Sequence, residues 1–247
     1  HRGEPDSYDG AFLMRSGESL VGMNHDMIKD IISEDVSDYS ADIIDGLEDN
    51  SLDPRAREMA RELWLRKSGS QNIELMTPDE VVQGLGLKDE RGITRAGLIL
   101  LGRENAISRF QPNAEVVWEY RRKSSDVQYA SRIDFRRAIL LYLDELWVQI
   151  DARNEVAHVN EGFLIRDIPA FTETTIRESV LNAITHRDYR DQGSVYIRQS
   201  GDLMLVESPG GFIGGITPEN IMRAASKPRN RLIAEVFQKL GLVERSG

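Results

Sequence analysis

Hydrophobic residues follow two different spacings along this chain, and the two spacings predict an α/β protein. Several segments carry apolar residues every three or four positions, which is typical of amphipathic helices. Shorter runs rich in Val, Ile and aromatic residues lie between them and indicate strands. We expect helices at about 27–32, 55–67, 134–150, 172–186, 218–224 and 230–240, and strands at 11–14, 114–120, 162–165, 194–198 and 203–206.

Two local patterns refine this prediction. Residues 200–202 (SGD) separate the last two strands, and such a turn favours a β-hairpin. Residues 79–102 indicate two short helices around a turn, with Thr77 as an N-cap and Pro78 in the first helical turn. A helix–turn–helix unit can read DNA, but the second helix (93–102) is very apolar and lacks the exposed polar residues of a recognition helix. We therefore expect these two helices to form a packing hairpin.

The chain divides into three segments, 1–50, 51–170 and 171–247, and charge sets the first of them apart. The first segment carries thirteen acidic and three basic side chains, and the other two together carry 28 of each sign, so the net charge of −10 lies within residues 1–50. We expect this segment to be a solvated acidic linker, with a protein-binding tail as the alternative. Residues 51–170 are expected to form a middle α/β extension of the C-terminal segment.

The rest of the composition excludes several classes of site. The chain has no Cys, so it has no disulfides and no Cys-ligated zinc or iron–sulfur site, and its four His residues are too scattered for a metal cage. No apolar run is long enough for a membrane span and no signal peptide is visible, so we expect a cytoplasmic protein without membrane contact. The overall charge lacks the basic footprint of a nucleic-acid-binding domain.

The helix predicted at 172–186 carries the first candidate site. Glu178 and Asn182 lie four residues apart, which is about one helical turn, so their side chains share a face. Apolar residues on the opposite side would pack the helix against the rest of the protein. A carboxylate can orient a water molecule, and an amide oxygen can ligate a hard cation such as Mg²⁺. Two solvated polar residues on a surface helix would show the same spacing.

The loop after the last predicted strand carries the second candidate site. Glu207 ends that strand, and four glycines follow within the next eight positions, among them Gly210 and Gly211. Glycines allow a backbone to approach a ligand closely, although a flexible surface loop would explain them equally well. A Glu-x-x-x-Asn helix, a hairpin and an acid-plus-glycine loop follow one another in this order in one ATP-binding fold.

This order resembles the GHKL superfamily, the Bergerat-fold ATPases that include DNA gyrase B, histidine kinases and MutL. One bacterial branch is more similar, and its members are labelled RecG-related helicases or transcriptional regulators. The residues that carry this likeness are 177–189 (RESVLNAITHRDY), 207–211 (ESPGG), 226–230 (SKPRN) and 237–245 (FQKLGLVER). The resemblance implies a two-layer sandwich of helices on a mixed, mostly antiparallel sheet, with a helical N-terminal extension.

Two earlier segments also resemble this branch. Residues 85–102 are similar to its middle segment, and residues 8–17 are similar to the last strand of its AlbA-like, Schlafen-type domain. The resemblance therefore implies that residues 1–50 are the remnant and linker of an AlbA-like domain. It also implies that residues 171–247 are a GHKL-like ATP-binding module that stops before its phosphate lid.

The resemblance assigns roles to individual residues. Glu178 matches the general base that orients the attacking water, and Asn182 matches the residue that ligates Mg²⁺ beside the ATP phosphates. Glu207 stands where the superfamily has the Asp that accepts a hydrogen bond from the adenine amino group, and Gly210 and Gly211 belong to the same loop. ATP and Mg are thus the implied cofactors. The sequence departs from the superfamily in having Glu in place of Asp, and Pro209 where Gly is preferred.

Two functions follow from this resemblance. One is an ATP-binding regulatory module of a transcriptional regulator, with slow Mg-dependent hydrolysis, a homodimeric arrangement and DNA contact through domains outside this chain. The alternative is a non-catalytic scaffold for protein–protein contacts that no longer binds nucleotide. No Gly-x-x-x-x-Gly-Lys-Ser/Thr loop is present, so the helicase label has no support in the sequence.

Three neighbouring side chains have two interpretations each. His186 is interpreted as a capping or packing residue, with a proton shuttle as the alternative. Lys227 and Arg229 are interpreted as parts of a surface turn, with phosphate contact as the alternative.

Overall fold

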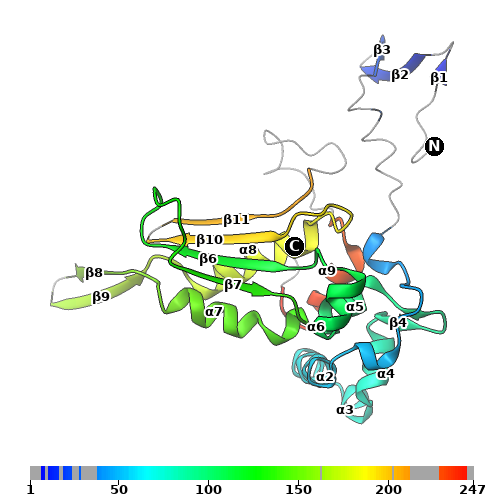
Figure 1. Cartoon of the computed structure of the whole chain (residues 1–247), viewed down its shortest axis with the longest axis horizontal. Helices are drawn as coiled ribbons and strands as arrows, with labels where there is room; N and C mark the ends of the chain where they lie inside the picture. Colours follow the sequence, from blue (N-terminus) through cyan, green and yellow to red (C-terminus); the bar gives the residue numbers. More distant parts are fainter. Residues whose placement is uncertain are drawn as a thin grey trace.

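The computed structural model of this chain describes residues 7–8, 11–16, 19–23, 28, 38–161, 163–201, 203–211 and 228–243. Helices and mixed sheets with antiparallel strands occur together in this part of the chain, which confirms the predicted α+β fold (Figure 1). Within these ranges, no helix combines the length and the apolar character needed to cross a membrane.

A four-stranded sheet forms the centre of the main body. Its strands are β6 (Val116–Arg121), β7 (Ser131–Phe135), β10 (Val195–Ser200) and β11 (Leu203–Glu207), in the spatial order β11-β10-β6-β7. β10 pairs with β6 in parallel, whereas β11 and β7 are antiparallel to their neighbours. The sheet is therefore mixed and mostly antiparallel, and its parallel pair joins strands that are far apart in the sequence.

One face of this sheet is buried beneath helices. Trp118 of β6 and Ile197 of β10 lie opposite each other on this face, and both are fully buried. The helices α7 (Leu143–Asp151) and α8 (Glu173–His186) cover it (Figure 1). Because strand side chains alternate between faces, Glu119 points to the opposite face.

The opposite face of the sheet is held by ion pairs. The carboxylate of Glu119 is almost fully buried, and its oxygens lie 3.1 Å from Arg121, 3.3 Å from Arg132 and 3.3 Å from Arg198. Three guanidinium groups from three strands therefore surround one carboxylate. A buried carboxylate is stable only when it is paired in this way.

The residues before β6 form a helical region that shares the hydrophobic core of the sheet. Asp53 caps the first long helix by accepting a hydrogen bond from the backbone of Arg55 at 2.8 Å, and Gly69 ends that helix in a left-handed conformation. Thr77 and Glu80 form a reciprocal capping box at the start of α4. The helices of this region are α2 (Pro54–Ser68), α3 (Gln71–Leu75), α4 (Pro78–Gly84), α5 (Arg95–Leu101) and α6 (Glu104–Phe110).

The two helices predicted within residues 79–102 are α4 and α5, and they pack as expected. A short antiparallel pair, β4 (Lys88–Asp89) and β5 (Gly92–Ile93), forms the turn between them. Every residue from 96 to 101 of α5 is buried. A helix with no exposed residue in its central turns cannot present side chains to a DNA groove, so this pair is a packing unit.

Shorter elements complete the described part of the chain. β1 (Ser7–Tyr8), β2 (Ala11–Ser16) and β3 (Ser19–Gly22) form a small antiparallel sheet, so the predicted strand at 11–14 is confirmed. The helix α9 (Arg231–Lys239) confirms the helix predicted at 230–240 and buries Ile233, Val236 and Phe237. Single 3-10 turns lie at Tyr39–Ala41, Asp49–Ser51 and Ile139–Leu141.

Two predicted elements were wrong. The single helix expected at 134–150 is instead the end of β7, a 3-10 turn and α7, because Phe135 pairs with Val116 in the sheet. The single strand expected near 162–165 is a two-stranded hairpin, formed by β8 (Val156–Glu161) and β9 (Leu164–Pro169). The predicted helix at 218–224 lies outside the described residues, as does the one at 27–32 apart from Ile28.

Gly97 gives a test of the packing of α5. In most helices Gly to Ala is stabilising by roughly 0.5–1 kcal/mol. A methyl group at Gly97, however, would lie 2.4 Å from the carbonyl oxygen of Leu87. We expect Gly97→Ala to lower the free energy of unfolding by about 1–3 kcal/mol, which a thermal melt would show as a drop of several degrees. Gly211→Ala is the control, because its methyl group would meet no atom within 4 Å. Equal melting temperatures for the two variants would contradict this packing.

Candidate functional site

The helix α8 carries the first candidate residues. Thr172 is its N-cap and accepts a hydrogen bond from the backbone of Thr175 at 3.3 Å. Ile176, Val180 and Ile184 lie on its buried face, within the common core. The sheet therefore fixes the rotation of α8, and this rotation decides which side chains face outward.

Glu178 and Asn182 both lie on the exposed face of α8. They are one helical turn apart, so their carboxylate and carboxamide lie side by side on this face. The buried stripe of the helix holds its backbone in place. The structure thus brings these two predicted residues together and leaves them accessible to a ligand.

Glu207 lies on a different side of the sheet. Along β11, Met204 and Val206 pack against the core, whereas Leu203, Leu205 and Glu207 are exposed. Glu207 therefore points away from the face that α8 covers, and its carboxylate pairs with the guanidinium of Arg198. The structure does not bring Glu207 to the side of Asn182.

Ser208, the next residue, points the opposite way. Its hydroxyl donates a hydrogen bond of 3.0 Å to the backbone carbonyl of Ala183 in α8. The loop that follows β11 is therefore attached to α8 directly after Glu207. Ser208 was not among the predicted site residues, although strand alternation places it on the side opposite to Glu207.

The rest of this loop lies against the end of α8. The backbone N–H of Asp188 donates to the carbonyl of Pro209 at 2.8 Å. Gly210 has a φ of +112°, and a methyl group there would lie 3.1 Å from the β-carbon of Asp188. Gly210 is therefore required by both its conformation and its close approach. Gly211 has no atom within 4 Å of such a methyl group and is exposed.

Arg229 connects three parts of this region. Its guanidinium lies 3.1 Å from the carboxylate of Asp188, and it donates to the carbonyls of Gly211 at 2.9 Å and His186 at 3.3 Å. One side chain thus joins the end of α8, the glycine loop and the segment before α9. The guanidinium is already engaged, which favours the structural interpretation of Arg229. Lys227 lies outside the described residues.

Asn230 completes this connection. It is fully buried, and its side-chain amide donates to the backbone carbonyls of Thr185 at 2.9 Å and Arg187 at 2.8 Å. The last carbonyls of a helix have no partner within the helix, so Asn230 caps the C-terminal end of α8 from the start of α9. The motifs at 186–189 and 228–230 are therefore two halves of one joint, which sequence spacing could not show.

Arg187 is buried inside the same joint. Its guanidinium donates to the backbone carbonyls of Asp191 and Gly193 and lies 5.1 Å from the ring centre of Tyr189. Burial lowers the pKa of Arg187 and raises that of Tyr189. The arginine orders the loop between α8 and β10.

His186 lies at the end of α8 beside Arg229. Burial lowers its pKa below the usual value, and the positive charge of Arg229 lowers it further. The imidazole is therefore neutral near pH 7. A neutral, partly buried ring at a helix end favours the packing interpretation over a proton shuttle.

No set of three or more His, Cys, Asp or Glu side chains that could hold a metal occurs in the described part of the chain. Mg²⁺ does not require such a set, because in nucleotide sites it takes one or two protein oxygens together with phosphate oxygens. The exposed carboxamide oxygen of Asn182 has the chemistry of such a ligand.

A separate groove lies on another side of α8. It has a volume of about 440 Å³ and lies between α2, α7, α8 and the residues after α9. Leu63, Leu143, Trp147 and Ile176 are among its lining residues, whereas Glu178 and Asn182 are not. The groove and the exposed Glu178–Asn182 face are therefore two distinct surfaces.

Two family models match parts of the chain. Residues 193–247 match a family described as "Putative ATP-dependent DNA helicase recG C-terminal". The C-terminal segment is thus similar to an ATPase-like, RecG-related family. This match includes Glu207, Gly210 and Gly211 but begins after Glu178 and Asn182. Residues 26–117 match a domain family of unknown function, DUF8451.

A solved structure is similar to almost the whole chain. It is the crystal structure of the DIP2311 protein from Corynebacterium diphtheriae, with a TM-score of 0.68 and 23% sequence identity. The match covers 95% of this chain and 46% of that protein, so the chain spans about half of its length. At this identity the likeness concerns the fold. No curated protein matches the chain.

The lowered pKa of His186 predicts a pH dependence of stability. Because the folded protein binds a proton at His186 less readily than the unfolded chain, its contribution is fully present above the usual histidine pKa of 6.5 and is lost as the pH falls. We expect His186→Gln to lose less stability between pH 7.5 and 5 than the unsubstituted protein does. Denaturant unfolding at both pH values measures this difference. Identical losses would contradict a buried neutral imidazole.

The joint at the end of α8 predicts energetic coupling between Asp188 and Arg229. Both side chains are mostly buried, so we expect a double-mutant cycle with alanine to show a coupling free energy of at least about 0.5 kcal/mol. The exposed pair Asp89–Arg91 is the matched control and should show almost none. Denaturant unfolding supplies all the values. Equal coupling in the two cycles would show that the joint does not depend on this ion pair.

Proposed function

We propose that this chain is a Mg²⁺·ATP-binding module of the GHKL type, with the nucleotide phosphates at the exposed face of α8. The observation that carries the proposal is the placement of Glu178 and Asn182, which share an exposed face of a helix whose opposite face is buried beneath the sheet. The similarity of residues 193–247 to a family described as ATP-dependent supports it independently.

The two residues on α8 take different roles. The carboxamide oxygen of Asn182 would ligate Mg²⁺, which when bound neutralises phosphate charge and holds the phosphates in position. The carboxylate of Glu178, one turn away, would accept a hydrogen bond from a water molecule and orient it. Binding should therefore depend on Asn182, and turnover should depend on Glu178.

The glycine loop takes a positioning role in this proposal. Arg229 and Asp188 hold the loop at the C-terminal end of α8, and Ser208 attaches it to Ala183. The exposed backbone at Gly210 and Gly211 would lie beside the base of the nucleotide. The carboxylate of Glu207 would accept a hydrogen bond from the adenine amino group only after its side chain leaves Arg198 and turns toward α8. The hydroxyl of Ser208 already lies on the α8 side of the loop.

The orientation of Glu207 favours a second candidate function. Its ion pair with Arg198 occupies the side chain that should recognise adenine. A scaffold that has lost nucleotide binding but keeps the fold would show this arrangement. With either function, we propose that the protein takes part in transcription control and contacts DNA through domains outside this chain.

Calorimetric titration with Mg²⁺ and a non-hydrolysable ATP analogue distinguishes the two functions. We expect binding to the chain, a loss of at least tenfold in affinity in Asn182→Ala, and retained binding in Glu178→Gln. In an ATP hydrolysis assay, Glu178→Gln should lose turnover because the water is no longer oriented.

Arg177→Gln is the matched control for these variants. Arg177 is an exposed residue of α8, but it lines the separate groove rather than the Glu178–Asn182 face. Its substitution should change neither affinity nor turnover. If the folded chain does not bind nucleotide at millimolar concentration, the ATP-binding proposal is wrong and the scaffold function is favoured.

A further inference from the structure

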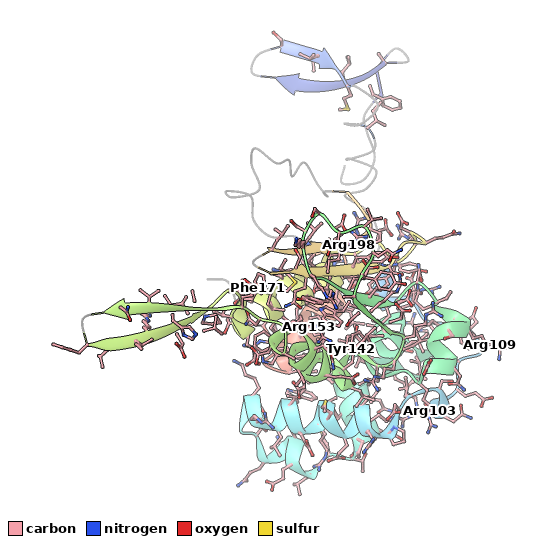
Figure 2. All side chains as sticks on the ribbon, turned by 60° about the vertical axis from the view of Figure 1, so that its left-hand side comes forward. Arg103, Arg109, Tyr142, Arg153, Phe171 and Arg198 are labelled. Carbon is pink, nitrogen blue, oxygen red and sulfur yellow. The ribbon has the colours of Figure 1, made fainter. Side chains whose placement is uncertain are left out.

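The β-hairpin formed by β8 and β9, residues 156–169, extends away from the main body, and we call it the arm. In both views the two strands continue beyond the sheet and the helices without covering either (Figures 1 and 2). Six residue pairs, from Val156–Pro169 to Glu161–Leu164, keep the strands in register. An isolated two-stranded hairpin is at best marginally stable in water, so its folded form needs further support.

The root of the arm is rigidly attached. Asn154 accepts a hydrogen bond from the backbone of Phe171 at 3.0 Å and donates one to its carbonyl at 2.8 Å. The backbone of Ala170 donates to the carbonyl of Glu155 at 2.8 Å. Arg153, which directly precedes Asn154, lies over the rings of Trp118 and Tyr120. Phe171 and Arg153 mark this root in Figure 2. The arm is thus held in a defined direction by the core of the protein.

The surface of the arm is apolar to an unusual degree. Six of its large hydrophobic side chains are exposed, and Phe163 at the tip is completely so. The strand register places Val159, Leu164 and Ile168 on one face of the hairpin. Val156 and Ile165 lie on the opposite face. Exposed apolar side chains gathered on one face of an element mark interaction sites. The exposed apolar residues are Val156, Val159, Phe163, Leu164, Ile165 and Ile168.

The same chain offers a surface that could receive the arm. The groove between α2, α7 and α8 contains Leu63, Leu143 and Trp147, and its volume of about 440 Å³ exceeds that of one large side chain. Glu173 and Arg177, at its rim, lie on the first turns of α8, directly after the arm in the sequence. The projecting arm and the partly apolar groove are therefore connected through the first turns of α8.

We propose that the arm is a dimerisation element, and that its tip packs into the groove of a second copy of this chain. Because each copy carries both the arm and the groove, a two-fold axis would satisfy both contacts at once and close the assembly. A second copy is therefore the occupant that matches this surface, without any further partner. The proposal does not depend on nucleotide binding.

The available area is sufficient for such a dimer. At about 100 Å² for each large apolar side chain, Phe163 at the tip and the three residues of one face would remove roughly 400 Å² from water on each arm. The lining of the groove exposes roughly half of that area. Two reciprocal contacts would then bury roughly 1,200 Å², which lies at the lower end of the range for stable protein–protein interfaces.

The first test measures oligomeric state without nucleotide. Light scattering across a range of concentrations should give a dimer for the unsubstituted chain and a monomer for Phe163→Asp combined with Ile165→Asp. Val127→Asp is the matched control, because Val127 is an equally exposed apolar residue away from the arm. All variants should keep the same circular dichroism, since none of these side chains belongs to the core. A chain that is monomeric at all concentrations, or a dimer that survives the arm substitutions, overturns the proposal.

The second test locates the contact with disulfides. The chain has no cysteine, so each introduced thiol is unique. Mixing Leu164→Cys with Leu143→Cys under oxidising conditions should give a covalent dimer that neither variant forms alone. A covalent dimer of Leu164→Cys alone would mean that two arms pair with each other, and it would overturn the assignment of the groove. Absence of a crosslink in the mixture would overturn it as well.

Discussion

The buried amide of Gln199 holds the main body together. Its oxygen accepts a hydrogen bond from the indole of Trp118, 81 positions earlier in the chain, at 3.2 Å. Its nitrogen donates to the carbonyls of Ile150 at 3.0 Å and Arg153 at 3.2 Å, where α7 ends. A buried polar group whose hydrogen bonds are all made favours one arrangement of the surrounding elements, because any other arrangement would leave hydrogen-bonding groups unpaired. This contact therefore joins β6, β10 and the end of α7, next to the root of the arm.

A second polar joint controls the candidate nucleotide site. Asn230 and Arg229 bind the end of α8 and the glycine loop, so residues that are about forty positions apart act as one unit. The Glu178–Asn182 face itself needs few direct supports, because the buried stripe of α8 already fixes its orientation. The structure thus separates the residues that would contact a ligand from those that position the backbone around it. The arm and the groove lie outside this joint, so the proposed assembly and the proposed nucleotide binding would use separate surfaces.

The accuracy of the sequence predictions followed the range of the interactions involved. The helix at 172–186, the hairpin at 200–202 and the capping of α4 were predicted correctly, since caps, turns and helical spacing are local signals. The helix expected at 134–150 was wrong in its first part. Phe135, Tyr142, Leu146 and Ile150 are all buried with helical spacing, but Phe135 is buried as part of a strand. Only its pairing with β6 distinguishes the two conformations.

The sequence by itself determined the α+β class, most of the helices and strands, and the proximity of Glu178 to Asn182, because each depends on residues within about one turn or one strand. The tertiary structure decided the direction of Glu207. Residues 203–206 are all apolar, so alternation alone could not tell which face of β11 is buried; the packing of Met204 and Val206 decided it and turned Glu207 toward Arg198. The joint of Asp188 with Arg229, the burial of Arg187 and the projection of the arm were likewise decided by contacts between distant segments. Burial depends on the whole assembly of elements, and no local pattern encodes it.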